Sequence, residues 1–275
     1  TFILFGIFAE VSVTKLFMAG ILPGLLTVSV YASMIIFRCW RNPALAPRTE
    51  MDVTWVSRFK ALGAIWPIIL LIVSLLVGFY QGILTATEGG AYGAFTLLVI
   101  SMLQGRMSRE VFIKSIRSTL LSTASLLWIA VGAIMFTRFL AITGTADAIS
   151  DLVGIWVSGP ISALLIAAAI FLVLGMFLDP LGILLLALPI VLPMFRELGM
   201  NLIWIGVLVV KFIEIGLLTP PVGMNVYAIK NVVDERIPLG TIFTGTFWFL
   251  SCEVLVVALL ILLPGISLWI PSLLG

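Results

Sequence analysis

The 275-residue sequence has no histidine, only two cysteines, and few charged residues, which make up 10% of the chain. Without histidine, the chain has no imidazole proton relay and lacks the commonest metal ligand. Cys39 lies beside a basic segment and Cys252 within an apolar run, so we expect free thiols rather than a disulfide framework. The sequence also has no phosphate-binding loop, dinucleotide-binding glycine pattern or catalytic triad. It therefore favours neither an enzyme nor a nucleic-acid-binding protein.

Long apolar runs are abundant instead, since 62% of the residues are hydrophobic. Soluble domains are roughly a quarter charged, so this composition predicts an all-α polytopic membrane protein. A membrane-spanning helix needs about 20 mostly apolar residues. The candidate spans are residues 16–37, 62–80, 83–103, 120–140, 202–229 and 243–263, together with a longer block at 161–195.

The charges in the linkers predict the orientation of these spans. Linkers 38–60 and 104–117 are rich in Lys and Arg, so we expect both to be cytoplasmic. The linker 143–159 contains Asp147 and Asp151 but neither Lys nor Arg, and we expect it on the opposite side.

The apolar block 161–195 has room for about two short helices on either side of the segment Leu174-Gly-Met-Phe-Leu-Asp-Pro-Leu181. Two full crossings would place this turn in the cytoplasm, although it carries an acid and no base. A re-entrant hairpin that enters and leaves on the outer side keeps the orientation of every other linker, and we favour it. It would put Asp179 near the middle of the bilayer, where an acidic residue usually has a functional role.

The segment Gly216-Leu-Leu-Thr-Pro-Pro-Val-Gly223 interrupts the apolar run 202–229. Proline lacks a backbone N–H and clashes with the preceding turn, so we expect the helix to break near residues 219–222. Unpaired backbone at membrane depth persists only when buried in protein or lining a wet cavity. Transporters bind ions and substrates at such breaks. An ordinary proline-kinked helix is the alternative.

A hairpin turn beside a broken helix would offer several backbone carbonyls at close range, which suits a hard cation such as Na⁺. Glycines would let the backbones approach closely. The predicted Na⁺-site residues are Gly175, Asp179, Gly216, Thr219 and Gly223. Asn225 follows the break and would either reach a ligand or link two helices.

Three other charged positions are secondary candidates. Lys211 and Glu214 share a helix face, and we favour a buried structural ion pair over direct ligand contact. Glu88 follows Thr85 and suits the start of a helix, where capping and an ion-linked role are both open. For Glu253 we expect a partner on another helix or subunit.

Five segments of the sequence resemble the C-terminal part of the large membrane subunit of tripartite ATP-independent periplasmic (TRAP) transporters, the dicarboxylate-transporter M family. The resemblance covers almost the whole chain in family order. It rests on Lys15-Leu-Phe-Met-Ala-Gly-Ile-Leu-Pro-Gly24, Ala86-Thr-Glu-Gly-Gly-Ala91, Leu174-Gly-Met-Phe-Leu-Asp179, Pro189-Ile-Val-Leu-Pro193 and Gly216-Leu-Leu-Thr-Pro-Pro-Val-Gly223. At Ala86 the family often has proline, so the local geometry there is expected to differ.

The resemblance implies the second half of an inverted-repeat ion-transporter fold, with a re-entrant helical hairpin and a broken transmembrane helix. Residues 1–60 would hold the end of the first repeat and a linking helix with a cytoplasmic basic loop, and residues 61–275 the second repeat. That repeat would comprise scaffold helices at 62–140, the hairpin at 161–195, the broken helix at 202–229 and the last helix at 243–263. Most of the first repeat is expected to be missing.

The resemblance further implies an elevator-type, Na⁺-coupled importer of organic acids, C4-dicarboxylate-like or sialic-acid-like, in the bacterial cytoplasmic membrane. Its implied partners are a periplasmic substrate-binding protein and a small four-helix membrane subunit, with Na⁺ as coupling ion and no other cofactor. The implied substrate-binding residues are Asp179, Pro180, Thr219, Pro220, Pro221 and Asn225. The alternative is a truncated, non-transporting remnant with only a structural or interaction role, because the first repeat is expected to be missing.

Overall fold

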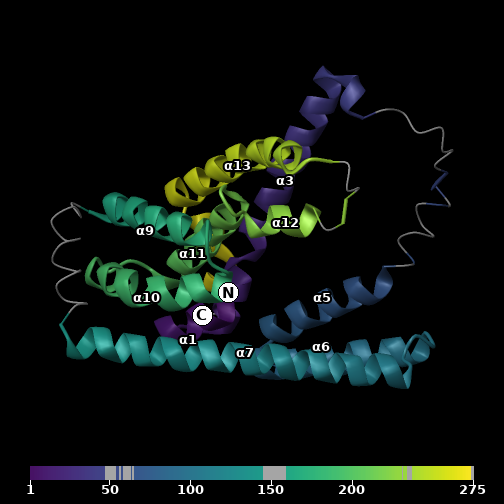
Figure 1. The fold of residues 1–275 in the computed structure, drawn as a ribbon, viewed down its shortest axis with the longest axis horizontal. Coiled ribbons are helices and arrows are strands. Elements are labelled where there is room, and N and C mark those ends of the chain that lie inside the picture. The colour runs from purple at the N-terminus through teal and green to yellow at the C-terminus, as the bar shows by residue number, and fades with distance from the viewer. Residues whose placement is uncertain are drawn as a thin grey trace. The chain divides into compact units, whose positions relative to one another are not determined.

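The computed structural model describes residues 1–46, 54–55, 57, 63, 65–144, 159–230, 232–233 and 237–273 (Figure 1). In these ranges the regular secondary structure is helical, with no strand. Three described helical segments are long and apolar enough to cross a membrane, namely Val13–Arg41, Pro180–Glu197 and Leu239–Leu262. The expectation of an all-α polytopic membrane protein is therefore confirmed.

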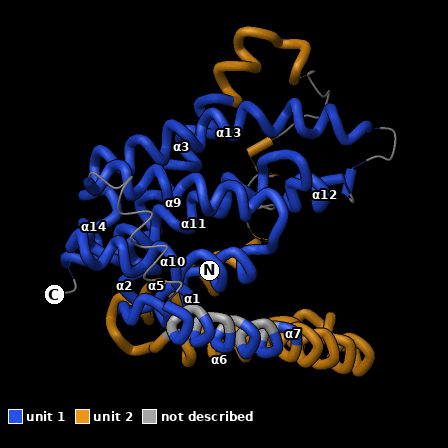
Figure 2. The backbone as a smooth tube through the Cα atoms, turned by 60° about the vertical axis from the view of Figure 1, so that its left-hand side comes forward, with its two compact units in different colours: residues 1–34, 125–275 blue, residues 35–124 orange. Residues whose placement is uncertain are grey.

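The chain divides into two compact units, residues 1–34 with 125–275 and residues 35–124 (Figure 2). Apart from parts of α3 (Ile21–Arg41) and α7 (Arg109–Ile142), the first unit contains α1 (Phe2–Ala9), α2 (Val13–Ala19), α9 (Pro160–Gly175), α10 (Pro180–Glu197), α11 (Leu202–Leu218), α12 (Met224–Lys230), α13 (Leu239–Leu262) and α14 (Gly265–Ser272). The second unit contains η1 (Pro43–Leu45), α5 (Trp66–Tyr80) and α6 (Ala86–Leu103).

Helix α11 lies at the centre of the first unit. It packs most extensively on α9 and also contacts α13, α2, α10 and α1. Its side chain Leu208 is fully buried together with Phe171 of α9 and Ile183 of α10. The indole Nε1 of Trp204 donates a hydrogen bond of 2.9 Å to the Leu260 carbonyl of α13. The core of this unit therefore surrounds the helix that precedes the predicted break.

Helices α9 and α10 form a helical hairpin around a short turn at residues 176–179. The residues of this turn favour the start of α10. Asp179 is the N-cap of the helix, and Pro180 occupies its first turn, where proline is tolerated. The two short helices expected within 161–195 are therefore confirmed.

The predicted helix break is also confirmed. Helix α11 ends at Leu218 and α12 begins at Met224, with a non-helical segment at residues 219–223 between them. Within this segment the Pro220–Pro221 peptide is cis, and Gly223 has a φ of 61°. Glycine is favoured at such a positive φ because it has no Cβ.

In the second unit, α5 packs against α6. The close approach depends on glycine: a Cβ on Gly78 would lie 2.5 Å from the Leu84 side chain, and one on Gly89 would lie 2.5 Å from Phe79. Helix α6 begins with a capping box formed by Thr85 and Glu88.

The expected linker 104–117 is wrong in its extent, because α7 already begins at Arg109 and runs unbroken to Ile142. The Ser108 hydroxyl accepts a hydrogen bond of 3.2 Å from the Val111 N–H and so caps the start. Arg and Lys are good helix formers, so the basic residues extend the apolar helix rather than interrupting it.

Two smaller differences concern other helix ends. The span expected at 16–37 belongs to a longer helical stretch, α2 and α3, interrupted at Gly20. A further short helix, α14, follows the expected last helix after Pro264. Asp147, Asp151 and residues 47–53, 56 and 58–60 of the linker 38–60 lie outside the described residues.

Candidate functional site

The hairpin meets the end of the broken helix through two glycines. A Cβ placed on Gly175, the last residue of α9, would lie 2.7 Å from the Cα of Gly216 on α11. Any side chain at either position would therefore push the two backbones apart. Gly216 is three residues before Thr219, so the carbonyl ends of two helices converge next to the break. Terminal carbonyls carry partial negative charge, and each carbonyl oxygen has two lone pairs, which favours a cation.

The carboxylate of Asp179 is half-buried and turned back onto its own helix. Its two oxygens accept hydrogen bonds of 3.1 Å from the Leu181 N–H and 3.4 Å from the Gly182 N–H. These bonds make Asp179 the N-cap of α10. Each carboxylate oxygen has a further lone pair, so capping and cation binding are compatible. A role of Asp179 in Na⁺ binding stays a prediction.

The side chain of Thr219 is also bonded locally, since its hydroxyl donates a hydrogen bond of 2.6 Å to the Ile215 carbonyl. The oxygen of that hydroxyl can still accept or coordinate. Pro220 and Pro221 follow in the break, and Asn225 is exposed on α12. Gly223 is buried, with a built Cβ only 3.0 Å from the Phe243 ring. The predicted site residues thus lie in the hairpin turn and the helix break, and their ligand roles stay predictions.

An apolar cavity of about 410 Å³ lies beside the break. Leu218, which immediately precedes Thr219, forms part of its wall. The rings of Tyr31 and Phe249 also line it and pack edge to face, with their centroids 5.0 Å apart. The complete lining is Tyr31, Leu218, Ile229, Ile242, Gly245, Thr246 and Phe249.

A charged cluster, buried at Lys211 and Glu253 and half-exposed at Glu214, joins three helices of the first unit. The Lys211 Nζ lies 2.8 Å from Glu214 Oε2 and 3.3 Å from Glu253 Oε1. The Tyr31 hydroxyl donates a hydrogen bond to the same Glu253 Oε1. Lys211 and Glu253 are only 8% and 2% exposed. The predicted Lys211–Glu214 ion pair is confirmed, and so is the expectation that Glu253 pairs with another helix.

Sequence reasoning missed Tyr31, which lies 222 residues before its partner Glu253. No local pattern connects the two residues. The available signal was indirect: an acid inside the apolar run 243–263 requires a polar partner.

Glu88 is confirmed as a capping residue in the second unit. Its carboxylate accepts a hydrogen bond of 2.8 Å from the Thr85 N–H, and the Thr85 hydroxyl accepts one of 3.4 Å from the Glu88 N–H. The side chain is exposed, and its ion-linked role stays a prediction.

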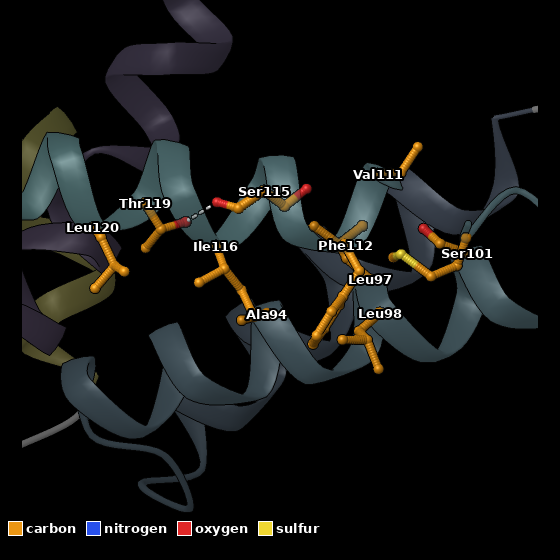
Figure 3. A pocket seen from close by; sticks show the side chains of 11 residues that line it. Ala94, Leu97, Leu98, Ser101, Val111, Phe112, Ser115, Ile116, Thr119 and Leu120 are labelled. Carbon is orange, nitrogen blue, oxygen red and sulfur yellow. Dashed lines mark hydrogen bonds between the residues drawn. The ribbon is translucent and has the colours of Figure 1, made fainter. Parts of the chain in front are cut away.

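A second cavity, of about 590 Å³, lies between α6 and α7 in the second unit (Figure 3). None of its lining residues is charged, and most are apolar. The hydroxyl of Thr119 donates a hydrogen bond of 2.9 Å to the Ser115 carbonyl, so it is satisfied within its own helix (Figure 3). This cavity therefore has little of the chemistry that an ion site requires.

The described part of the chain contains no group of three or more Cys, Asp or Glu side chains suited to a metal ion. A cation at the break would instead need carbonyl and hydroxyl oxygens. Oxygen ligands of this kind suit hard cations, and the converging helix ends of α9 and α11 supply them.

Many secondary transporters have a broken helix within a multi-pass membrane fold, as this chain does. The chain matches the family described as "Tripartite ATP-independent periplasmic transporter, DctM component" over residues 1–266, and it belongs to this family. The resemblance noted from the sequence is thereby confirmed. This is a family of transporters, so the prediction that the chain is not an enzyme is also confirmed.

Several curated large permease proteins are similar to this chain. The C4-dicarboxylate TRAP transporter protein DctM of Pseudomonas aeruginosa is 33% identical over 97% of this chain and 61% of its own length. The sialic acid protein SiaM of Vibrio cholerae is 28% identical over 98% and 62%. The ectoine protein TeaC of Halomonas elongata is 29% identical over 98% and 62%. The chain thus spans about three fifths of the length of these relatives.

Proposed function

We propose that this chain forms the ion-binding and substrate-binding part of a Na⁺-coupled importer of organic acids in the bacterial cytoplasmic membrane. The main support is the contact between Gly175 and Gly216, which packs the hairpin against the end of the broken helix. The relatives are named for C4-dicarboxylate, sialic acid and ectoine, all of which carry a carboxylate. An organic carboxylate is therefore the proposed substrate class.

The hairpin is re-entrant in this proposal. Helix α9 has 16 residues and α10 has 18. At 1.5 Å per residue these helices are about 24 Å and 27 Å long, near the lower limit for spanning the ~30 Å hydrocarbon core, so a re-entrant course is compatible with their length. A hairpin that enters and returns places the turn at 176–179 within the bilayer. In the inverted-repeat fold that the family resemblance implies, the first repeat would supply a second hairpin and a second broken helix.

Na⁺ would bind where the carbonyl ends of α9 and α11 converge. Its ligands would be backbone carbonyls near Gly175, Gly216 and Gly223, together with the oxygens of Asp179 and Thr219. The bound cation would then offset the charge of the substrate carboxylate, because opposite charges attract strongly where the effective dielectric constant is low. Na⁺ binding would thus precede substrate binding, with Pro180, Pro220, Pro221 and Asn225 framing the substrate.

The proposed transporter works with two partners. A periplasmic binding protein would deliver the organic acid, and a small four-helix membrane subunit would complete the membrane complex. The unit that holds the hairpin and broken helix would carry the substrate across by an elevator motion.

The test is Na⁺-dependent uptake by the complete transporter in liposomes. Asp179→Asn keeps a good N-cap but removes the charge, so helix α10 should persist. Thr219→Val removes the hydroxyl oxygen with little change in shape. We expect each change to raise the Na⁺ concentration for half-maximal uptake by about 10-fold, equivalent to ~1.4 kcal/mol.

Thr244→Val is the matched control. Thr244 lies exposed on α13, and its hydroxyl bonds the Gly240 carbonyl at 2.9 Å, the same local arrangement as at Thr219. This variant should keep the wild-type Na⁺ dependence. Unaltered Na⁺ dependence in both the Asp179 and the Thr219 variants would contradict the proposed site.

A further inference from the structure

The first turns of α7 have a shallow depression on their surface that is lined mainly by cations. Its lining residues are Arg109, Glu110, Ile113, Lys114 and Arg117. They recur at intervals of three and four residues, so they share one face of the helix. Three basic side chains against one acid leave this face with an excess of positive charge.

The protein itself does not neutralise these three cations. Within the described part of the chain, no side chain forms an ion pair or hydrogen bond with Arg109, Lys114 or Arg117. Glu110 stands one turn before Lys114 but is not paired with it. All four charged side chains are exposed. The depression therefore attracts an anion from outside the described residues.

The place of the depression along α7 indicates where that anion comes from. Arg117 is the last charged residue before 118–137, a run of 20 residues without a charge. About 20 residues cross the hydrocarbon core, so Arg117 falls at the boundary of the core and Lys114 about one turn farther out, among the lipid headgroups. Basic residues at this level attract anionic lipids, chiefly on the cytoplasmic side, where we expect this end of α7.

The same face of α7 also offers apolar surface. Ile113 lies within the depression and is 54% exposed, and Leu120, one turn beyond Arg117, is 64% exposed. A soluble anion would gain nothing from these side chains, whereas lipid tails are as apolar as leucine and would pack along them. A molecule with an anionic head and an apolar tail therefore matches this face better than a free phosphate ion does.

We propose that this depression is a binding site for an anionic phospholipid. The guanidinium groups of Arg109 and Arg117 donate charge-assisted hydrogen bonds to the lipid phosphate, because their planar arrangement of N–H groups fits phosphate oxygens. Lys114 adds a point charge beside them. Glu110 repels the phosphate and limits the affinity. The acyl chains run along the apolar part of the same face toward the hydrocarbon core.

This lipid site is separate from the proposed Na⁺ site, because residues 109–117 belong to the second unit and the hairpin turn and helix break belong to the first. It therefore holds whether or not the transporter couples to Na⁺. A lipid bound here would anchor the start of α7 at the membrane surface.

The test is a lipid titration of the complete, delipidated transporter in nonionic detergent, followed by native mass spectrometry. Phosphatidylglycerol is the anionic probe, and phosphatidylcholine with the same acyl chains is the zwitterionic comparison. We expect the wild-type protein to bind phosphatidylglycerol at least about 10-fold more tightly. Arg109→Gln and Arg117→Gln should each weaken phosphatidylglycerol binding by about 5-fold and leave phosphatidylcholine binding unchanged.

Arg106→Gln is the matched control. Arg106 is exposed in the loop before α7 and does not line the depression, so this variant removes the same charge nearby without touching the site. We expect it to change phosphatidylglycerol binding by less than about 2-fold. Glu110→Gln removes the repulsion and should strengthen binding by about 5-fold, a gain that a misfolded protein would not show.

Four outcomes would overturn the proposal. The first is equal affinity for the two lipids. The second is an equal loss for Arg106→Gln and Arg117→Gln, which would mean diffuse attraction to a basic surface instead of a site. The third is unchanged or weaker binding in Glu110→Gln. The fourth is displacement of phosphatidylglycerol by an equal concentration of inorganic phosphate, which would mean that the depression recognises a soluble anion.

Discussion

Helices α11 and α5 are both continuous, strongly apolar and of similar length, yet their surroundings are opposite. In α11, eleven of 17 residues are buried, whereas in α5 only Pro67, Gly78 and Phe79 of 15 residues are buried. Their composition does not distinguish them, because lipid tails are as apolar as leucine and an exposed apolar side chain costs nothing in a bilayer. Apolar character therefore identifies a membrane helix but not its burial.

The residues that differ are the charged ones, because both helices contain closely packed glycines. Helix α11 carries Lys211 and Glu214, and its Gly206 and Gly216 touch other elements. Helix α5 has no charged residue. In a membrane protein, charged residues within a span almost always face the protein interior or a wet cavity, so they mark the buried helix.

The largest expected effect comes from removing the cation of the buried cluster. Lys211→Met leaves two acids without their shared partner, and such a loss typically costs about 3–5 kcal/mol. Lys114→Met, at an exposed position on α7, should change stability by no more than about 0.5 kcal/mol. Denaturant unfolding in detergent micelles measures both. An equal loss in the free energy of unfolding for both variants would contradict the proposed difference between buried and exposed charges.

The difference in burial between the apolar side chains of α11 and α5 is tested next by truncating one side chain on each helix. Leu208 of α11 is 0% exposed, and Leu208→Ala should cost about 2–5 kcal/mol because it leaves a cavity. Ile68 of α5 is 57% exposed, and for Ile68→Ala we expect a change within about 0.5 kcal/mol. The same unfolding measurement compares them. A large loss for Ile68→Ala would mean that another protein surface, rather than lipid, covers α5.

A smaller effect is expected from adding one methyl group at the helix contact. Gly216→Ala places a Cβ 2.7 Å from the Gly175 Cα, and since backbone cannot move aside cheaply, we expect a loss of about 1–3 kcal/mol. In Gly90→Ala, on α6, the Cβ meets nothing within 4 Å, and the better helix propensity should make this control neutral or slightly stabilising. Thermal unfolding in detergent separates the two variants. A neutral Gly216→Ala would argue against the close approach of α9 and α11.

The elements of the candidate site were predictable because they depend on local chemistry. The consecutive prolines at 220 and 221 prevent a continuous helix wherever the chain places them. Asp179 followed by Pro180 strongly favours the start of a helix, so the hairpin turn could also be predicted from the sequence. The division into residues 1–60 and 61–275 stays a prediction, as does the ion chemistry at the turn and the break.

Other features were not predictable from local patterns. The start of α7 was misplaced because basic residues are compatible with a linker and with a helix that continues past its apolar segment. The bond between Tyr31 and Glu253 was missed because two residues 222 positions apart meet only when three helices pack together.

The amino-acid sequence by itself determined that this is a helical membrane protein with interruptions at defined points, because helix length, apolarity and proline act within a few residues. The tertiary structure alone decided which apolar helix became the buried centre, which glycines touch and which acids share one lysine. These outcomes depend on contacts between distant segments, and such contacts form only when the helices pack against one another.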